Sequence, residues 1–506
     1  MNHKSYQPTR ESLSSHPLPQ WFDEAKFGIF IHWGPYSVPG FAPVGNFANT
    51  LKTDYDRAML VYPYAEGYWN AIKDQTTPSA RYHQAVYGSM PYQGFKPLFM
   101  DGVKQWDPMA WAKIFRNAGA KYVVIVSKHH DGFCLWPTKV ANPHEPHWFS
   151  ERDIIGELAD AVRSEGLRFG IYYSGGIDWT FRRRISRTFM DYSFSTPGGD
   201  YAAYADAQIR ELISRYRPDI LWNDICWPGN VDSFFRLFAY YYNAVPEGVV
   251  NDRWKHSTSA NKLLSLKLVR AVMDMMIKRM IMNNPDIHSA LPQPAIPHSD
   301  FSTPEYTKHK EIQPGKWEMT RGIGNSFGYN RNEQDNDYSS FETLLIDFID
   351  ALSKNGNLLL NVGPRGEDAQ IPPEQLSRLS KFGDWLQRNG EAVYGTRPLI
   401  RAEAETETGE TIRFTRKENR LYLIISGRPN GITIKVKEFF CEGTANLLTD
   451  GSPVQLKREG EDMNLIFKHR LEHIFVPVIV IEEEDDDGMK RSPAVAAGAN
   501  LEGSEG

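Results

Sequence analysis

Apolar segments of strand length alternate with helical patterns along most of this chain, and this alternation limits the folds open to it. The strand candidates are apolar on both faces, which is typical of parallel strands covered by helices. They are 27–34, 121–132, 167–176, 220–224, 248–254, 316–320 and 357–363. Helical patterns separate them at 107–120, 154–166, 201–216, 232–245 and 341–354. Six or seven such units over about 370 residues favour an α/β fold of the (β/α)8-like TIM barrel type over an open, doubly wound sheet.

Loop lengths indicate which end of this barrel carries the functional site. The helix-to-strand connections are short, whereas the strand-to-helix connections 35–106 and 177–200 are long. In (β/α)8 barrels the long loops after the strands form the catalytic face. We therefore expect the site at the carboxyl ends of the strands.

The pattern changes after a helical stretch at 373–390. Residues 400–482 alternate apolar and polar side chains between turn residues, which predicts a small antiparallel β domain. We divide the chain into an N-terminal extension at 1–17, a barrel at 18–395, a C-terminal antiparallel β-sandwich at 396–482 and a tail at 483–506. The tail is acidic and then rich in small polar residues, a composition that predicts disorder.

One segment within the barrel, 255–299, does not follow the alternation. It contains a basic amphipathic helical pattern with five methionines between 273 and 282, and then a proline-rich stretch. Three interpretations stay open: an added barrel element, a flexible rim, or a helix that binds a partner.

Composition and charge bear on partners and compartment. The net charge is −6, so nothing points to nucleic acid or a membrane surface as a partner. No apolar run approaches the roughly 20 residues of a membrane span. The three cysteines, Cys134, Cys226 and Cys441, are odd in number and form no CxxC motif, which favours a reducing compartment. Because the N-terminus also lacks the apolar core of a secretory signal, we expect a cytoplasmic protein. Whether it is a homo-oligomer stays open.

Polar and aromatic side chains gather at the expected carboxyl ends of the strands. In chain order these ends carry His32 and Trp33, His129 to Asp131, Tyr172 and Tyr173, Trp222 to Asp224, Asn251 to Trp254, and Arg321. Each alone has an ordinary reading as a turn, a helix cap or a core residue, but together they predict one ionisable pocket with aromatic walls. The sequence shows no metal-ligand spacing, no phosphate loop and no GxSxG elbow.

Carboxylates between aromatic walls, with histidine and arginine nearby, suit a sugar. Cleaving a glycosidic bond requires two carboxyl groups with separate roles, one ionised and one that holds a proton. Asp224 is the natural ionised group, with Arg253 or neighbouring hydrogen-bond donors keeping its pKa low. The spacing does not identify the second group, for which five residues are eligible: Glu66, Asp178, Glu305, Glu318 and Glu333.

Several longer stretches resemble one known family. They are WFDEAKFGIFIHWGPYSVPGF (21–41), AKYVVIVSKHHDGFCLWPTK (120–139), LRFGIYYSGGIDW (167–179), LWNDICWP (221–228), NDRW (251–254), TRGIGNSFGYNRNE (320–333) and NLLLNVGPRG (357–366). In this order they resemble glycoside hydrolase family 29, the α-L-fucosidases, and in particular the bacterial type. The resemblance implies a barrel followed by a β-sandwich and a retaining double displacement without a metal or other cofactor. It also implies a fucosylated oligosaccharide or glycoconjugate as the substrate.

The resemblance further implies roles for individual residues. Asp224 of LWND matches the nucleophile of the family. The stretch DFSTPEY (300–306) matches the region that carries the acid/base in bacterial relatives, which gives Glu305. Phe327 would suit the methyl group of fucose. The full set that matches fucose-binding residues is His32, Glu66, His129, His130, Tyr172, Trp222, Arg253 and Phe327.

Two features depart from the family pattern. The insertion 255–299 separates NDRW from DFSTPEY, where relatives have only a short loop, and Gly67 stands where close relatives often carry Trp. The leading interpretation is an exo-acting, retaining and metal-free α-L-fucosidase. If the insertion displaced the loop of Glu305, the alternative would be a catalytically impaired fucose-binding protein. A third interpretation is a metal-dependent barrel hydrolase, which loss of activity on chelation would favour.

Overall fold

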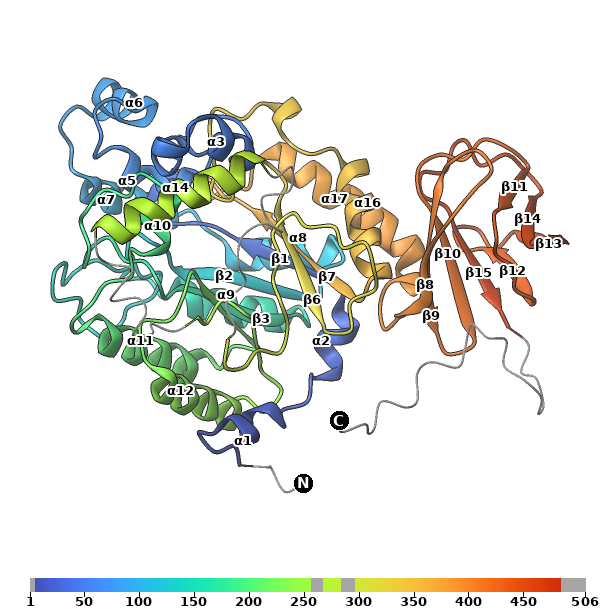
Figure 1. Ribbon diagram of the computed structural model, residues 1–506, viewed down its shortest axis with the longest axis horizontal. Coiled ribbons are helices and arrows are strands. Elements are labelled where there is room, and N and C mark those ends of the chain that lie inside the picture. Colours follow the sequence, from blue (N-terminus) through green and yellow to red (C-terminus); the bar gives the residue numbers. More distant parts are fainter. Residues whose placement is uncertain (1–4, 256–266, 284–295, 484–506) are drawn as a thin grey trace.

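The computed structural model describes residues 5–255, 267–283 and 296–483, and is built around a parallel sheet (Figure 1). Nearly all of the tail expected to be disordered, 484–506, and the proline-rich stretch up to residue 295 lie outside the described residues. The strand order in the parallel sheet is β5-β4-β3-β2-β1-β7-β6. These strands are β1 (Phe27–Ile31), β2 (Tyr122–Lys128), β3 (Arg168–Ser174), β4 (Ile220–Asp224), β5 (Val249–Val250), β6 (Trp317–Gly322) and β7 (Gly356–Val362).

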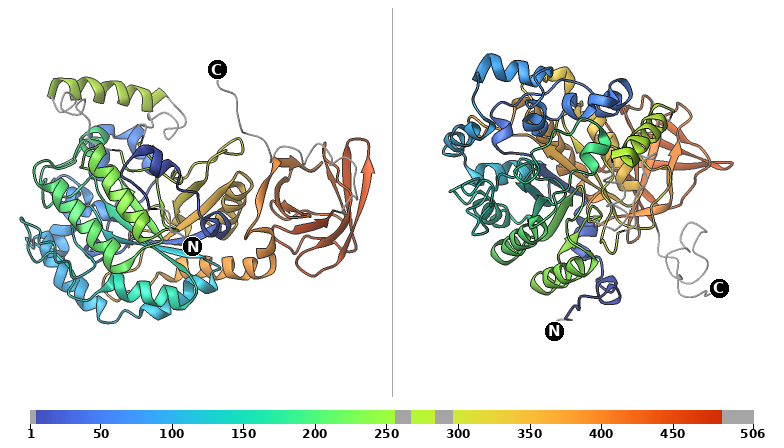
Figure 2. Two further views of the ribbon diagram at one scale, coloured as in Figure 1. Left: turned by 90° about the horizontal axis from the view of Figure 1, so that it is seen from below. Right: turned by 60° about the vertical axis from the view of Figure 1, so that its left-hand side comes forward.

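Helices cover the outer face of this sheet (Figure 2). They are α8 (Pro108–Asn117), α9 (Ile154–Ser164), α11 (Tyr201–Tyr216), α12 (Val231–Ala244), α16 (Phe341–Ser353) and α17 (Pro373–Asn389). Their ends follow local chemistry: Oδ1 of Asp107 accepts from the backbone N–H groups of Met109 and Ala110, and Pro108 opens α8. The predicted barrel of helix-covered parallel strands is thus confirmed.

Residues 300–306 close the barrel between β5 and β6. On one side, the Asp300 N–H donates to the Val250 carbonyl oxygen at 3.0 Å. On the other side, isolated parallel bridges join Ser302 to Trp317 and Glu305 to Thr320 of β6. This segment therefore occupies the eighth strand position without forming a regular strand. The prediction of a strand over 248–254 was too long, because β5 pairs only through Val249 and Val250.

The predicted amphipathic helix of the insertion is present as α14 (Lys267–Asn283). It packs against α3 (Phe47–Thr53) and α10 (Phe189–Ser193), which belong to the two long loops at the catalytic end (Figures 1 and 2). Ile281 is fully buried against Leu51 and Tyr55, and the Tyr55 hydroxyl donates to Oδ1 of Asp274 at 2.9 Å. In the described residues the insertion is therefore an added element at the rim.

The C-terminal strands form an eight-stranded antiparallel sheet in the order β11-β14-β13-β12-β15-β10-β9-β8. They are β8 (Arg397–Glu405), β9 (Thr411–Lys417), β10 (Arg420–Ile425), β11 (Thr433–Val436), β12 (Thr444–Leu447), β13 (Pro453–Glu459), β14 (Asp462–Phe467) and β15 (Val478–Glu482). Every strand sends side chains into one apolar core, and a bridge between Thr406 and Val436 brings the two edges together. The sheet thus folds over its own core, as expected of a sandwich.

The two sheets are held together by an apolar contact. Tyr422 and Ile424 of β10 belong to the same buried cluster as Trp385 of α17. The Trp385 indole N–H also donates to the Val476 carbonyl oxygen at 3.2 Å. Among the described residues, no helix combines the length and the hydropathy needed to cross a membrane.

Candidate active site

Asp224 ends β4, at the point where the strand reaches the catalytic end of the barrel. All five residues of this strand are buried. The Tyr172 hydroxyl donates to Asp224 Oδ2 at 2.8 Å, and Arg253 Nη1 donates to Asp224 Oδ1 at 3.0 Å. Burial alone would raise the pKa of Asp224, but Arg253 and the Tyr172 hydrogen bond outweigh it and hold this pKa below its ordinary value. The carboxylate is therefore ionised and fixed in direction.

Arg253 links Asp224 to a second carboxylate. The same Nη1 atom lies 2.7 Å from Glu305 Oε1. Because both acidic oxygens contact one nitrogen, they are no farther apart than the sum of the two distances, about 5.7 Å. The Glu305 side chain is 25% exposed and that of Asp224 is 12% exposed, so Glu305 lies nearer the solvent. The insertion has not displaced Glu305 from the site.

The His32 ring is oriented by Asn361 and offers a hydrogen-bond acceptor. Asn361 Nδ2 donates to the Phe327 carbonyl oxygen at 2.6 Å, so its Oδ1 accepts from His32 Nδ1, also at 2.6 Å. Burial lowers the pKa of His32 to about 4. The ring is therefore neutral at pH 7. Because Nδ1 carries the proton, Nε2 can accept a hydrogen bond from a group such as a sugar hydroxyl.

The two adjacent histidines have different surroundings. Ser174 Oγ donates to the Ile177 carbonyl oxygen, so His130 Nδ1 donates to Ser174 Oγ at 2.6 Å. Burial lowers the pKa of His130 to about 3 and that of His129 well below its ordinary value. His129 stacks on Tyr172, and its buried Nδ1 has no hydrogen-bond partner within the described structure. An unpaired buried nitrogen is costly, and a ligand hydroxyl would satisfy it.

Glu66 and Phe327 form one wall of the site, because Glu66 binds the loop that carries Phe327. The Gly328 N–H donates to Glu66 Oε2 at 2.9 Å. Burial raises the pKa of Glu66 to about 7, and the negative charges of Glu305 and Asp224 add to this. The Phe327 ring lies 5.1 Å from the His32 ring and 5.4 Å from the Tyr64 ring, centroid to centroid. It offers an apolar surface beside polar groups.

Trp222 forms the floor of this site between Tyr172 and Arg253. Its ring stacks on Tyr172 at 5.4 Å, and the Arg253 guanidinium lies 4.7 Å from its centroid. All ten residues selected from the sequence therefore belong to one connected region around the strand ends.

Three of the five eligible carboxylates have structural partners instead. Asp178 forms a fully buried ion pair with Lys128 at 2.8 Å. Glu333 Oε1 accepts from the N–H groups of Asn325 and Ser326. Glu318 is fully buried and accepts from the Tyr122 hydroxyl at 2.5 Å. Glu305 is the candidate acid that contacts Arg253.

Glu318 gives a prediction for stability against pH. Burial raises its pKa to about 7 from an ordinary 4.5. Because its pKa is raised, Glu318 makes its full contribution to the free energy of unfolding below pH 4.5. This contribution is lost as the pH rises through 7, which lowers the free energy of unfolding by about 3 kcal/mol. Glu318→Gln should therefore raise the melting temperature relative to the native protein more at pH 8 than at pH 5.

Calorimetric melting at both pH values measures this difference. Glu11→Gln, on an exposed helix position, is the control and should change neither melting temperature. Equal shifts for Glu318→Gln at the two pH values would contradict the prediction.

Gly67 has a structural explanation in Tyr62. A Cβ atom on Gly67 would lie 2.2 Å from the Tyr62 hydroxyl oxygen, and Tyr62 is buried. Tyr62 thus occupies space that a tryptophan at position 67 would need.

Sequence reasoning did not select three further residues of the site. Thr303 accepts from Arg253 Nε through its hydroxyl and from Nη2 through its carbonyl oxygen. Asn361 orients His32, and the Tyr36 hydroxyl is buried without a hydrogen-bond partner within the described residues. Asn361 is a polar residue at a strand end, so the signal that found the others would have found it. Thr303 lies inside the DFSTPEY stretch and Tyr36 inside the 21–41 stretch, but no role was assigned to either residue there.

The family model described as Alpha-L-fucosidase matches residues 1–391. The chain belongs to the alpha-L-fucosidase family. This confirms the resemblance to glycoside hydrolase family 29 and shows the chain to be a glycoside hydrolase. The Thermotoga maritima alpha-fucosidase in complex with a mechanism-based inhibitor is 41% identical, with a TM-score of 0.80 over 94% of this chain and 100% of that one.

More distant members of the fucosidase family are also similar to this chain in sequence and in fold. Alpha-L-fucosidase isoenzyme 1 from Paenibacillus thiaminolyticus is 25% identical, with a TM-score of 0.65 over 94% of this chain and 100% of its own. The tissue alpha-L-fucosidase of Bos taurus is 30% identical over 435 residues, which is 83% of this chain and 77% of that protein. The similarity therefore extends across both sheets.

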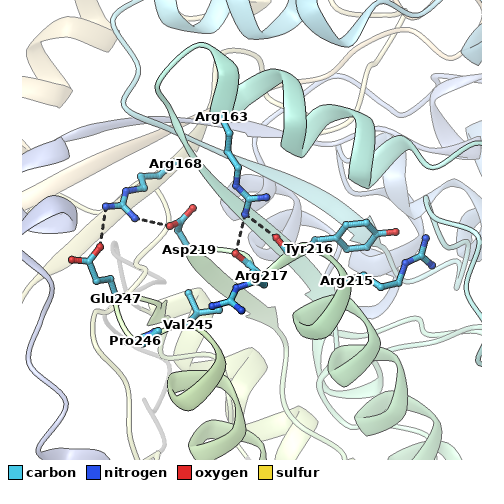
Figure 3. Close-up of a pocket in the computed structure, with 9 residues that line it drawn as sticks. All are labelled: Arg163, Arg168, Arg215, Tyr216, Arg217, Asp219, Val245, Pro246 and Glu247. Carbon is cyan, nitrogen blue, oxygen red and sulfur yellow. Dashed lines mark hydrogen bonds and ion pairs between the residues drawn. The ribbon is translucent and has the colours of Figure 1, made fainter. Parts of the chain in front are cut away.

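A separate pocket of about 390 Å³ lies at the other end of the barrel strands (Figure 3). There Arg168 pairs with Asp219 and Glu247 at 2.8 and 3.0 Å. Arg163 donates to the Tyr216 carbonyl oxygen at the end of α11, where a cation complements the helix dipole. These contacts stabilise the amino-terminal end of the barrel, away from the fucosidase site.

Proposed function

We propose that this protein is an exo-acting α-L-fucosidase that hydrolyses terminal α-L-fucosyl linkages with retention of configuration. The observation that carries the proposal is the contact of Asp224 and Glu305 with one arginine nitrogen, within about 5.7 Å of each other. Retaining glycosidases place their two carboxyl groups about 5 to 5.5 Å apart, whereas inverting enzymes need about 6.5 to 9.5 Å to admit a water molecule.

In the proposed first step, Asp224 attacks the anomeric carbon of the fucosyl residue. Glu305 gives its proton to the departing glycosidic oxygen, and a covalent fucosyl-aspartate forms. In the second step Glu305 takes a proton from water, the water oxygen attacks the anomeric carbon, and the bond to Asp224 breaks. The deeper position of Asp224 and the greater exposure of Glu305 suit a terminal sugar whose leaving group points outward.

Sugar recognition is assigned to the surrounding residues. The neutral His32 and His130 rings would accept from hydroxyl groups, and Phe327 would contact the C6 methyl group. Arg253 and Tyr172 keep Asp224 ionised and orient its carboxylate toward the anomeric carbon. The absence of a cofactor and the cytoplasmic location stay predictions, to be tested by chelation and by cell fractionation.

The test is hydrolysis of an aryl α-L-fucoside, followed by proton NMR of the first product. The proposal expects release of the phenol and α-L-fucose before mutarotation. Initial β-L-fucose would show inversion and overturn the mechanism. Binding of fucose without any release of phenol would instead support the catalytically impaired binding protein.

A further inference from the structure

The chain turns sharply directly after Asp224. Ile225 has φ +70°, and the Cys226 N–H donates to the Asp224 carbonyl oxygen at 2.9 Å. A β-branched residue in this left-handed region is strained, so surrounding contacts must hold it. The Gly176 N–H donates to the same carbonyl oxygen at 3.2 Å. A Cβ on Gly176 would lie 2.8 Å from the Cys226 nitrogen, so the loop that follows β3 packs tightly against this turn.

Asn223 connects the turn to Arg253. It is fully buried, and its Nδ2 donates to the Cys226 carbonyl oxygen at 3.1 Å and to the Arg253 carbonyl oxygen at 2.8 Å. One amide group thus spans the backbone just after Asp224 and the backbone of Arg253, the residue whose side chain contacts both carboxylates.

Pairing between β4 and β5 has already ended at this level. The last paired residues are Leu221 and Val250. Beyond them Asn251 replaces the ladder: its Oδ1 accepts from the Asn223 N–H and its Nδ2 donates to the Asn223 carbonyl oxygen, both at 2.9 Å. Asn251 therefore joins the strand ends, and the side chain of Asn223 remains for the turn and Arg253.

We propose that Asn223 is a positioning residue that sets the place of Asp224 relative to Arg253, and through Arg253 the spacing between Asp224 and Glu305. The inference rests on the proposed fucosidase function. Asn223 does not touch the substrate. It acts by holding two backbone segments, and the side chains of these segments contact the substrate.

The test compares Asn223→Ser with Asn357→Ser. Serine is too short to span both carbonyl oxygens and adds no charge. Asn357 is a matched control, because it is also fully buried and donates to one carbonyl oxygen, that of Phe22 at 2.9 Å, near the opposite end of the barrel. We expect kcat for an aryl α-L-fucoside to fall about 10- to 100-fold in Asn223→Ser. Fucose affinity, measured by calorimetry, should change less than about threefold, because most of the proposed binding groups lie on other strands.

The pH profile separates positioning from a purely structural role. The groups that face Asp224 are Arg253, Tyr172, His130, His32, Glu66, Glu305, Tyr192 and Cys226. Arg253 is the main group that lowers the pKa of Asp224 against its burial. Loosening this contact should move the acid limb of kcat/KM upward by about 0.5 to 1 pH unit. Asn357→Ser should lower the melting temperature without shifting the acid limb of kcat/KM.

An unchanged kcat and acid limb in folded Asn223→Ser would overturn the inference. If that variant does not fold, Asn251→Ser is measured instead, and it should move the acid limb in the same direction with a smaller loss of kcat. No movement there would overturn the inference as well. A native protein without fucosidase activity would refute the proposed function itself, and so the two failures are distinguishable.

Discussion

Replacing Asp224 with glycine should lower kcat for an aryl α-L-fucoside by several orders of magnitude, and azide should restore part of the lost turnover. The carboxylate is buried and is held by hydrogen bonds from Tyr172 and Arg253. Removing it eliminates the group that would capture the fucosyl carbon, and the vacated space admits a small anion that can attack in its place. The measurement is phenol release with and without azide, together with identification of the fucosyl azide product.

Asp219→Gly is the matched control for this experiment. Asp219 precedes the same strand at its opposite end and pairs with Arg168 in the pocket of Figure 3. Its loss should lower the melting temperature without a comparable loss of kcat and without azide rescue. A native rate in Asp224→Gly would remove Asp224 from the mechanism.

Replacing Glu305 with alanine should separate substrates by their leaving groups. A dinitrophenyl fucoside needs little protonation to depart, so its glycosylation rate should stay close to that of the native protein. A fucoside of an alkyl alcohol needs the proton and should slow by about 10²- to 10⁴-fold. Pre-steady-state phenol release and steady-state fucose release measure the two cases.

Glu333→Gln serves as the comparison, because Glu333 binds loop N–H groups near Phe327 rather than Arg253. It should change both substrates in the same proportion. If Glu305→Ala also slowed both equally, the proton would have to come from another acid.

Local patterns in the sequence predicted much of the barrel. The helix at 201–216 was predicted with the bounds that the structure shows, because its apolar spacing and the following Pro218 are local signals. The strand β4 was likewise predicted with its Asp224 end, since all its residues are buried. Asp224 and Arg253 could be placed together because parallel strands end on one rim.

Other parts depend on contacts between distant residues and were not predictable in this way. β5 is shorter than its apolar pattern suggested, because the asparagine side chains take over the pairing beyond Val250. The alternating pattern expected over 400–482 does not hold in β8, which begins at Arg397 and has mostly exposed residues. The relation of Gly67 to Tyr62 arises from packing, which spacing in a sequence does not reveal.

Residues 300–306 are held in place by bonds to strands on either side, so the chain leading into them is free to vary in length. Loop closure becomes only about 0.6 kcal/mol less favourable for each doubling of a flexible loop. Foreign segments could therefore be grafted between Lys255 and Pro297 without changing the catalytic spacing. Such chimaeras would change the side chains at the catalytic rim, where α14 packs against α3 and α10, and would leave the position of Glu305 unchanged.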